Sequence, residues 1–114
     1  MHAGIGDLQC IDRCVPFGVD TFDSSYPTRS ARHGTLYTSD GGELRIHQAL
    51  YREQFEPLEH GCHCWACTHH TRAYLHHLFK ACEPAYFVLA TQHNIIAYMR
   101  RMQQYRERIL ANDI

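Results

Sequence analysis

The stretch Cys62-His63-Cys64-Trp65-Ala66-Cys67 decides how the rest of this sequence is interpreted. Its three thiols fall within six positions and lie beside several histidines, which favours metal ligation over a disulfide scaffold. Three thiolates about 2.3 Å from one ion fill most of a tetrahedral zinc shell, and a histidine nitrogen completes it. A fourth protein ligand closes the shell, so we expect one structural zinc ion rather than a catalytic one.

The fourth ligand is not decided by spacing. His63, His69 and His70 are nearest, but a short loop that already holds three thiolates has little freedom left. His93 lies one helix further on, where a ligand would fasten that helix to the cysteine loop. Free thiols or a redox pair are less favoured, because a Cys-x-x-Cys redox motif usually follows a strand in a βαβ pattern and none is visible. The remaining cysteines lie on or near apolar helix faces and are predicted to be core residues: Cys10, Cys14 and Cys82.

Two helices are predicted after the cysteines. Residues 71–82 carry apolar side chains at helical spacing until Pro84 stops the pattern. A longer helix is predicted over residues 85–110. Its apolar stripe would consist of Ile95, Tyr98, Met99, Met102 and Ile109.

A hairpin is predicted before the cysteines, because residues 35–39 and 44–48 flank Asp40-Gly41-Gly42, whose glycines allow a tight turn. Residues 50–61 are expected to be irregular. Near the start, Leu8, Ile11 and Val15 share one face of a predicted short helix that ends by Gly18. Residues 19–23 are predicted to form a strand without a visible partner, and residues 27–34 a polar loop. A lone strand suggests a piece of a larger fold.

Composition is ordinary for a globular chain, with 45% hydrophobic and 20% charged residues among 114. The net charge of −1 predicts neither a nucleic-acid nor a membrane partner, although the last third is basic. No apolar run approaches the roughly 18 residues that span a bilayer. The first residues do not resemble a secretory signal, and the cysteine usage suits a reducing compartment, so the cytoplasm is expected.

Two features before the hairpin have both a bland and a functional interpretation. Asp23 ends the predicted strand, where a barrel enzyme commonly keeps a catalytic carboxylate, but a turn aspartate beside two serines is equally ordinary. The segment Thr28-Arg29-Ser30-Ala31-Arg32 offers two guanidinium groups and two hydroxyls, which suit phosphate or base-edge contacts. A solvated loop with incidental charges would have the same composition.

These motifs occur together and in this order in one family. Gly4-Ile5-Gly6, the segment GVDTFD at 18–23, PTRSARHG at 27–34, the three cysteines, TRAYLHHLFK at 71–80 and His93-Asn94 resemble bacterial tRNA-guanine transglycosylases. Those enzymes are also called queuine tRNA-ribosyltransferases. The resemblance covers nearly the whole chain without a large gap.

The resemblance implies roles for individual residues. Asp23 matches the nucleophile that attacks C1′ of the ribose at wobble position 34 of tRNAs with a GUN anticodon, so that guanine leaves and a 7-deazaguanine (preQ1 or queuine) replaces it. His93 joins Cys62, Cys64 and Cys67 as the fourth zinc ligand. Two segments match the loops that contact the RNA: Gly4, Ile5, Gly6, Asp7, Leu8, Gln9 and Cys10, and Thr28, Arg29, Ser30, Ala31 and Arg32.

The resemblance also implies an α/β fold, which is α+β for a fragment of this length. Residues 1–34 would be the last helix–strand units of a TIM (β/α)8 barrel with the nucleophile strand and the anticodon-reading loop. Residues 35–114 would be a zinc-binding subdomain with a hairpin and two C-terminal helices. A whole barrel needs about 250 residues, so only a C-terminal portion is present and the chain alone is expected to be inactive.

Some positions depart from the family pattern. Ser24 stands where the family usually has a cysteine, and Tyr26 replaces a smaller aliphatic residue, which could alter the pocket wall. The expected partners are the tRNA anticodon loop, the incoming base and a second copy of the chain in a homodimer, with no membrane. The alternative function is a zinc-stabilised module that binds tRNA or docks on a subunit without catalysis.

Overall fold

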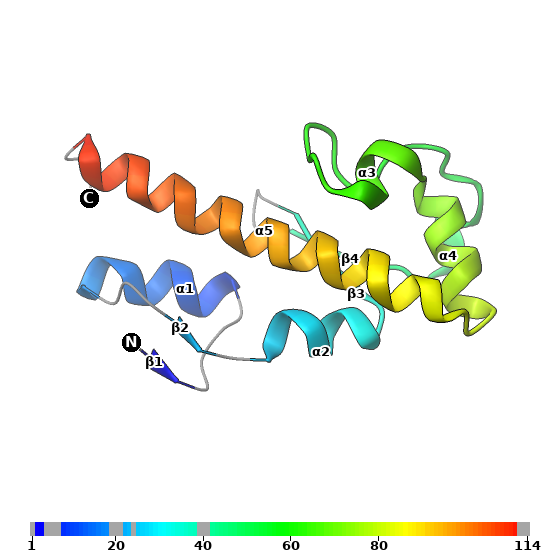
Figure 1. Ribbon diagram of the computed structural model, residues 1–114, viewed down its shortest axis with the longest axis horizontal. Helices are drawn as coiled ribbons and strands as arrows, with labels where there is room; N and C mark the ends of the chain where they lie inside the picture. The colour runs from blue at the N-terminus through cyan, green and yellow to red at the C-terminus, as the bar shows by residue number, and fades with distance from the viewer. Residues whose placement is uncertain (1, 4–7, 19–21, 24, 39–41, 112–114) are drawn as a thin grey trace.

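The computed structural model describes residues 2–3, 8–18, 22–23, 25–38 and 42–111. The molecule measures 44 × 27 × 20 Å, and helix α5 (Pro84–Leu110) runs along its length. Figure 1 shows α1 and α2 on one side of α5, α3 and α4 on the other, and the β3–β4 hairpin behind it. The predicted mixture of helices and strands is confirmed, and both C-terminal helices form close to their expected limits.

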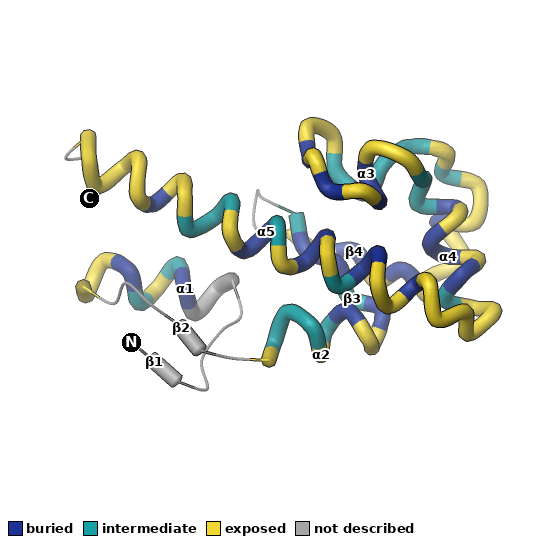
Figure 2. The backbone as a smooth tube through the Cα atoms, in the orientation of Figure 1, coloured by how far each residue is buried: buried dark blue, intermediate teal, exposed yellow. Residues whose placement is uncertain are grey.

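Helix α5 buries a face that hydropathy did not indicate. Figure 2 shows buried positions along its first two thirds and mostly exposed positions beyond them. The predicted apolar stripe is largely wrong, because Ile95, Met99 and Ile109 are exposed and only Tyr98 is buried. Small, aromatic and polar side chains form the buried face instead: Tyr86, Leu89, Ala90, His93, Asn94, Ala97, Tyr98 and Tyr105.

The predicted hairpin is confirmed, with shorter strands than expected. Strand β3 (Thr35–Tyr37) pairs antiparallel with β4 (Glu43–Arg45), and Leu36 faces Leu44 across the ladder. The predicted turn residues 39–41 lie outside the described part of the chain. Strand β4 ends at Arg45, and a 3₁₀ helix, η2 (Ala49–Glu53), follows it. This helix occupies the start of the region that was expected to be irregular.

The expected loop at residues 27–34 is wrong for most of its length, because helix α2 (Tyr26–Arg32) occupies it. Pro27 sits in the first turn of α2, where its missing N–H costs nothing. The Thr28 hydroxyl donates to the Ser25 carbonyl at 2.9 Å, and Ala31 is fully buried. A seven-residue helix is marginal alone, so its packing against α5 and β3 is what stabilises it.

The N-terminal region contains a second pair of strands. The predicted short helix is confirmed as α1 (Leu8–Cys14), followed by the 3₁₀ helix η1 (Val15–Phe17). Residues 22–23 of the predicted strand form β2 (Phe22–Asp23), while residues 19–21 are not described. The expectation that this strand lacks a partner is wrong: β1 (His2–Ala3) pairs with it in parallel. Two-residue strands carry too little pattern to be recognised in a sequence.

The cysteine region is more helical than a plain loop. Helix α3 (Trp65–His69) includes the third cysteine, and α4 (Arg72–Lys80) follows directly. The prediction of a core position is wrong for Cys82, which is exposed with φ of 56° just beyond α4, where the chain leaves the helix. Cys14 is only half-buried, and the side chain of Cys10 is outside the described part.

Buried side chains form two clusters. The larger joins the hairpin, the cysteine region, α4 and the first part of α5. The smaller joins Ile11 and Val15 to Tyr37 and the middle of α5. Each cluster takes residues from both sides of position 34, where the predicted domain boundary falls. That boundary and the barrel fragment stay predictions. None of the described helices has both the length and the apolar character needed to cross a membrane.

Candidate metal centre

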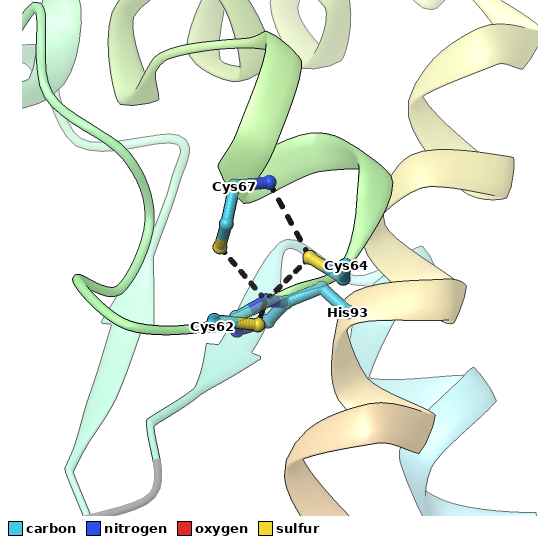
Figure 3. Close-up of side chains that lie close together, drawn as sticks. All are labelled: Cys62, Cys64, Cys67 and His93. Atoms are coloured by element: carbon cyan, nitrogen blue, oxygen red, sulfur yellow. Dashed lines mark hydrogen bonds between the residues drawn. The ribbon is translucent and has the colours of Figure 1, made fainter.

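Four buried side chains converge between α3 and α5. Cys62 precedes α3, Cys64 is its N-cap, Cys67 lies within it, and His93 comes from the tenth position of α5. Figure 3 shows the three sulfurs surrounding the His93 ring. Within the described residues, these are the only three or more His, Cys, Asp or Glu side chains that gather closely enough to hold a metal ion.

The spacing of the four ligand atoms fits a tetrahedral zinc shell. The Cys62, Cys64 and Cys67 sulfurs lie 3.7, 3.3 and 3.4 Å from His93 Nδ1. A tetrahedron with Zn–S of about 2.3 Å and Zn–N of about 2.0 Å has S···N edges of roughly 3.5 Å. All four ligand atoms lie within 4.8 Å of one another. The donor set and its geometry therefore suit zinc.

The orientation of the His93 ring is fixed by the hairpin. Its Nε2 donates to the Tyr37 carbonyl at 2.7 Å, because a carbonyl oxygen can only accept. When the ring is neutral, its one proton is on Nε2 and the Nδ1 lone pair is directed at the sulfurs, which is the tautomer that binds a metal. His93 is fully buried, so no solvent competes for either nitrogen.

Hydrogen bonds within the cluster favour a thiolate. The Cys67 thiol and backbone N–H both donate to the Cys64 sulfur and, with His93, lower the pKa of Cys64 to about 3. The pKa of Cys67 is raised, because its thiol donates that bond. Burial alone would lower the pKa of His93, but the Cys62 and Cys64 sulfurs outweigh it and raise this pKa to about 10. A bound cation would deprotonate the thiols and keep the ring neutral.

The approach to the cysteine loop is tied down by Arg72. Its guanidinium donates to Glu56 Oε1 at 3.0 Å and to Gln54 Oε1 at 2.9 Å. It also donates to the backbone carbonyls of Pro57 and Leu58. Four hydrogen bonds from one planar group hold the segment just before Cys62 in place. Sequence inspection gave Arg72 no role beyond its basic charge.

The nearer histidines do not join the cluster. His63 and His69 are exposed, and the His69 ring stacks on Trp65 with centroids 3.6 Å apart. His70 stacks on Tyr74 instead. The ambiguity in the sequence is resolved in space in favour of His93, because the sulfurs face α5.

The other predicted site residues fall on the opposite side of α5. Figure 1 places β2, which contains Asp23, below α5, and α3 above it. Arg29 and Arg32 are exposed on α2, and Arg29 lies over the Tyr26 ring at 5.4 Å from its centroid. Thr28 and Ser30 are half-buried. Of the predicted segment 4–10, residues 4–7 lie outside the described residues, and residues 8–10 begin α1.

Three residues that sequence inspection left without a role connect these regions. Asn94 is fully buried and uses both ends of its amide to hold β3 and α2. Tyr37 presents its backbone to α5 and its hydroxyl to α2, and the Tyr86 hydroxyl donates to the Ala31 carbonyl at 2.7 Å. In the sequence, the only indication of a role for Asn94 was its place beside His93 in one family motif, and that motif did not indicate which contacts Asn94 makes.

Comparison with known proteins agrees with this geometry. The family model described as queuine tRNA-ribosyltransferase matches residues 1–114. The chain belongs to this family. A queuine tRNA-ribosyltransferase of Protochlamydia amoebophila is 53% identical over 106 residues, which are 93% of this chain and 27% of that protein. A protein of the same name from Chlamydia trachomatis serovar L2 is 48% identical over 112 residues, covering 97% of this chain and 30% of that protein.

The predicted family is thus confirmed. The chain spans less than a third of the length of the curated relatives it matches. Their names describe enzymes that act on tRNA.

Proposed function

We propose that this chain is the C-terminal part of a tRNA-guanine transglycosylase and supplies three things to it. These are the nucleophile Asp23, RNA contacts from α2, and a structural zinc site. The observation that carries the proposal is the family match over all 114 residues, together with four metal-binding side chains in one buried cluster. The reaction would replace guanine by preQ1 or queuine at position 34 of GUN-anticodon tRNAs.

The Asp23 carboxylate would attack C1′ of the ribose as the bond to guanine breaks. The resulting aspartyl–ribose ester would be displaced by a ring nitrogen of the incoming base, which restores the carboxylate. Support comes from the backbone, because Asp23 ends a strand that is paired in parallel. Barrel enzymes keep their catalytic side chains at this end of parallel strands. The proton acceptor and the base pocket would lie in the part of the enzyme that this chain does not include.

Zinc would act as a scaffold. When bound, it would contribute folding free energy by linking α3 to α5, and the four protein ligands leave no position for a reacting water. The separation of the cluster from β2 by α5 supports this role. We assign Cys62, Cys64, Cys67 and His93 as the ligands of one ion.

The exposed apolar side chains of α5 have a place in the proposal. Val88, Ile95 and Met99 are 59%, 41% and 66% exposed and lie on one face of the helix at intervals of seven and four residues.

We propose that residues 1–34 complete a TIM barrel with the preceding part of the enzyme, and that residues 35–114 form the zinc subdomain. Apolar surface outside the barrel would join two enzymes in a cytoplasmic homodimer.

A chimera tests the enzyme proposal. This chain would replace the matching C-terminal part of the Protochlamydia amoebophila relative, and guanine incorporation into tRNA would be measured. We expect activity in the chimera and at least about a 1,000-fold loss in Asp23→Asn, because the nucleophile is removed. The active chimera should also form a tRNA adduct that resists denaturant, and this adduct should be absent in Asp23→Asn. Asp40→Asn makes the same chemical change in the predicted hairpin turn and should leave both unchanged.

The outcomes separate the two candidate functions. An adduct that persists in Asp23→Asn would overturn the nucleophile assignment. An inactive but folded chimera, combined with tRNA binding by this chain alone, would favour the alternative: a zinc-stabilised module that binds tRNA or docks on a subunit.

A further inference from the structure

The amide of Asn94 joins three backbone segments. Its Oδ1 accepts from the Tyr37 N–H at 3.0 Å, and its Nδ2 donates to the carbonyls of Pro27 and Thr35, both at 3.0 Å. Only this orientation of the amide pairs one donor with Oδ1 and two acceptors with Nδ2. The side chain is fully buried, so its loss would remove all three hydrogen bonds at a place shielded from solvent.

The neighbouring His93 holds the same strand from the same helix. Its Nε2 donates to the Tyr37 carbonyl, while Asn94 accepts from the Tyr37 N–H. Two consecutive residues of α5 therefore bind both backbone groups of one residue of β3. His93 faces the sulfurs with its other nitrogen, and Asn94 faces α2 with its other end. The His93-Asn94 pair therefore lies between the cluster of Cys62, Cys64 and Cys67 and helix α2.

Helix α2 is held by three such contacts. Asn94 binds the Pro27 carbonyl in its first turn, the Tyr37 hydroxyl donates to Ser30 Oγ at 3.0 Å, and the Tyr86 hydroxyl donates to the Ala31 carbonyl. All three lie on the buried side of α2. The side chains of Arg29 and Arg32, which also belong to α2, are exposed to solvent. The direction of both guanidinium groups thus follows from how α2 is seated.

We propose that Asn94 is a positioning residue that seats α2 so that Arg29 and Arg32 present their guanidinium groups to an RNA backbone. The inference rests on the proposed RNA contact of α2. Asn94 would touch neither the RNA nor the metal. It would act on RNA binding through Pro27 and β3. In a variant that lacks the Arg29 and Arg32 side chains, replacing Asn94 would therefore no longer weaken RNA binding.

The first test is local order, which needs no RNA. Amide hydrogen exchange is compared in the zinc-loaded chain for wild type, Asn94→Ala and Asn94→Asp, with Gln92→Ala as an exposed control on the same helix. The backbone amides of Arg29 in α2 and of His33 at its C-terminal cap should exchange at least about tenfold faster in both Asn94 variants. The α4 amides of Leu75 and Ala81 and the affinity for zinc should stay within about threefold, because the cysteine cluster does not contact Asn94.

The second test is a double-mutant cycle on binding to an RNA stem–loop with a GUN anticodon. The double-arginine variant Arg29→Ala/Arg32→Ala and the single variant Asn94→Ala should each weaken binding at least about tenfold. Adding Asn94→Ala to the double-arginine variant should weaken binding little further, because Asn94 acts only through these two arginines. An additive loss of about 100-fold would overturn the proposal. A general stabilising role would give that additive result.

Other outcomes are also decisive. If Asn94→Ala and Asn94→Asp both lose zinc or loosen α4 as much as α2, Asn94 is a general stabiliser and the proposal fails. If α2 exchange is unchanged, it fails as well. If the wild-type chain does not bind the stem–loop, the proposed RNA contact fails, while the exchange data still decide whether Asn94 seats α2.

Discussion

The two ends of this molecule are held together by different means. Around the metal cluster, buried polar side chains bridge segments that are distant in sequence, as Asn94, His93 and His76 do between the helices and the hairpin region. Around β1, α1 and β2, the structure depends on a two-residue parallel pair, a small apolar cluster and the partly exposed contacts of Asp12 with the end of α5. The metal-side region, which comprises the hairpin, the cysteine region, α4 and the first part of α5, relies on these polar bridges, whereas the N-terminal region relies more on the smaller apolar cluster.

Removing a metal ligand should have the largest effect. His93→Ala should lower zinc affinity by at least about 1,000-fold, because a structural zinc site supplies on the order of 10 kcal/mol and one of four ligands is lost. Cobalt substitution with competition by a chelator measures this. His69→Ala removes an exposed histidine close to Cys67 in the same helix and should leave affinity unchanged. Full affinity in His93→Ala would exclude it as a ligand.

Matched core substitutions should sharpen the contrast. Leu36 and Ile11 are both nearly inaccessible, but they belong to the larger and the smaller cluster respectively. Leu36→Ala should lower the free energy of unfolding by about 3–4 kcal/mol. Ile11→Ala should lower it by about 1 kcal/mol or less, because α1 can detach without unfolding the rest. Chemical denaturation followed by metal release measures both. Equal effects would show that the molecule unfolds as one unit.

The sequence predicted what depends on local chemistry. The cysteine spacing, the helix stop at Pro84 and the hairpin all follow from residues close together in the chain. It failed where tertiary contacts decide. The stripe of Ile95 and Met99 was predicted to face the core, yet α5 buries alanines, tyrosines and the His93-Asn94 pair. This pair stabilises the structure through hydrogen bonds rather than through apolar contact. Those bonds reach partners more than fifty residues away.

Helix α2 shows the same limit from the other side. Its sequence of serine, threonine and arginine suits a loop, and its packing on α5 and β3, with the hydrogen bonds from Tyr86 and Asn94, stabilises it as a helix. For the site, the four residues that form the buried cluster were predicted, but Arg72 and Asn94 were not, because a supporting residue has no spacing of its own. Family resemblance, rather than spacing, chose His93.

Glycine substitutions test how tightly the metal-side region is built. Gly34 has φ of +90°, and a Cβ there would lie 3.2 Å from the Phe79 ring. Gly61 has a similar φ of +84°, but a Cβ would meet nothing within 4 Å. Gly61→Ala should therefore cost about 1 kcal/mol from the backbone alone, and Gly34→Ala about 2–3 kcal/mol. Thermal unfolding measures the difference. Equal costs would mean that the Phe79 ring moves aside freely.

The smallest effect is expected where the N-terminal region meets the end of α5. The buried Tyr105 hydroxyl donates to Asp12 Oδ1 at 2.6 Å, and Arg101 lies 3.4 Å from the same carboxylate oxygen. Tyr105→Phe keeps the ring in place and removes one hydrogen bond to a partly exposed carboxylate, so it should cost about 1 kcal/mol. Hydrogen exchange should locate that loss in α1 and leave α4 unaffected. A loss spread over both helices would contradict the division of the molecule into two regions, because a contact at the weakly held end would then be stabilising the metal-side core.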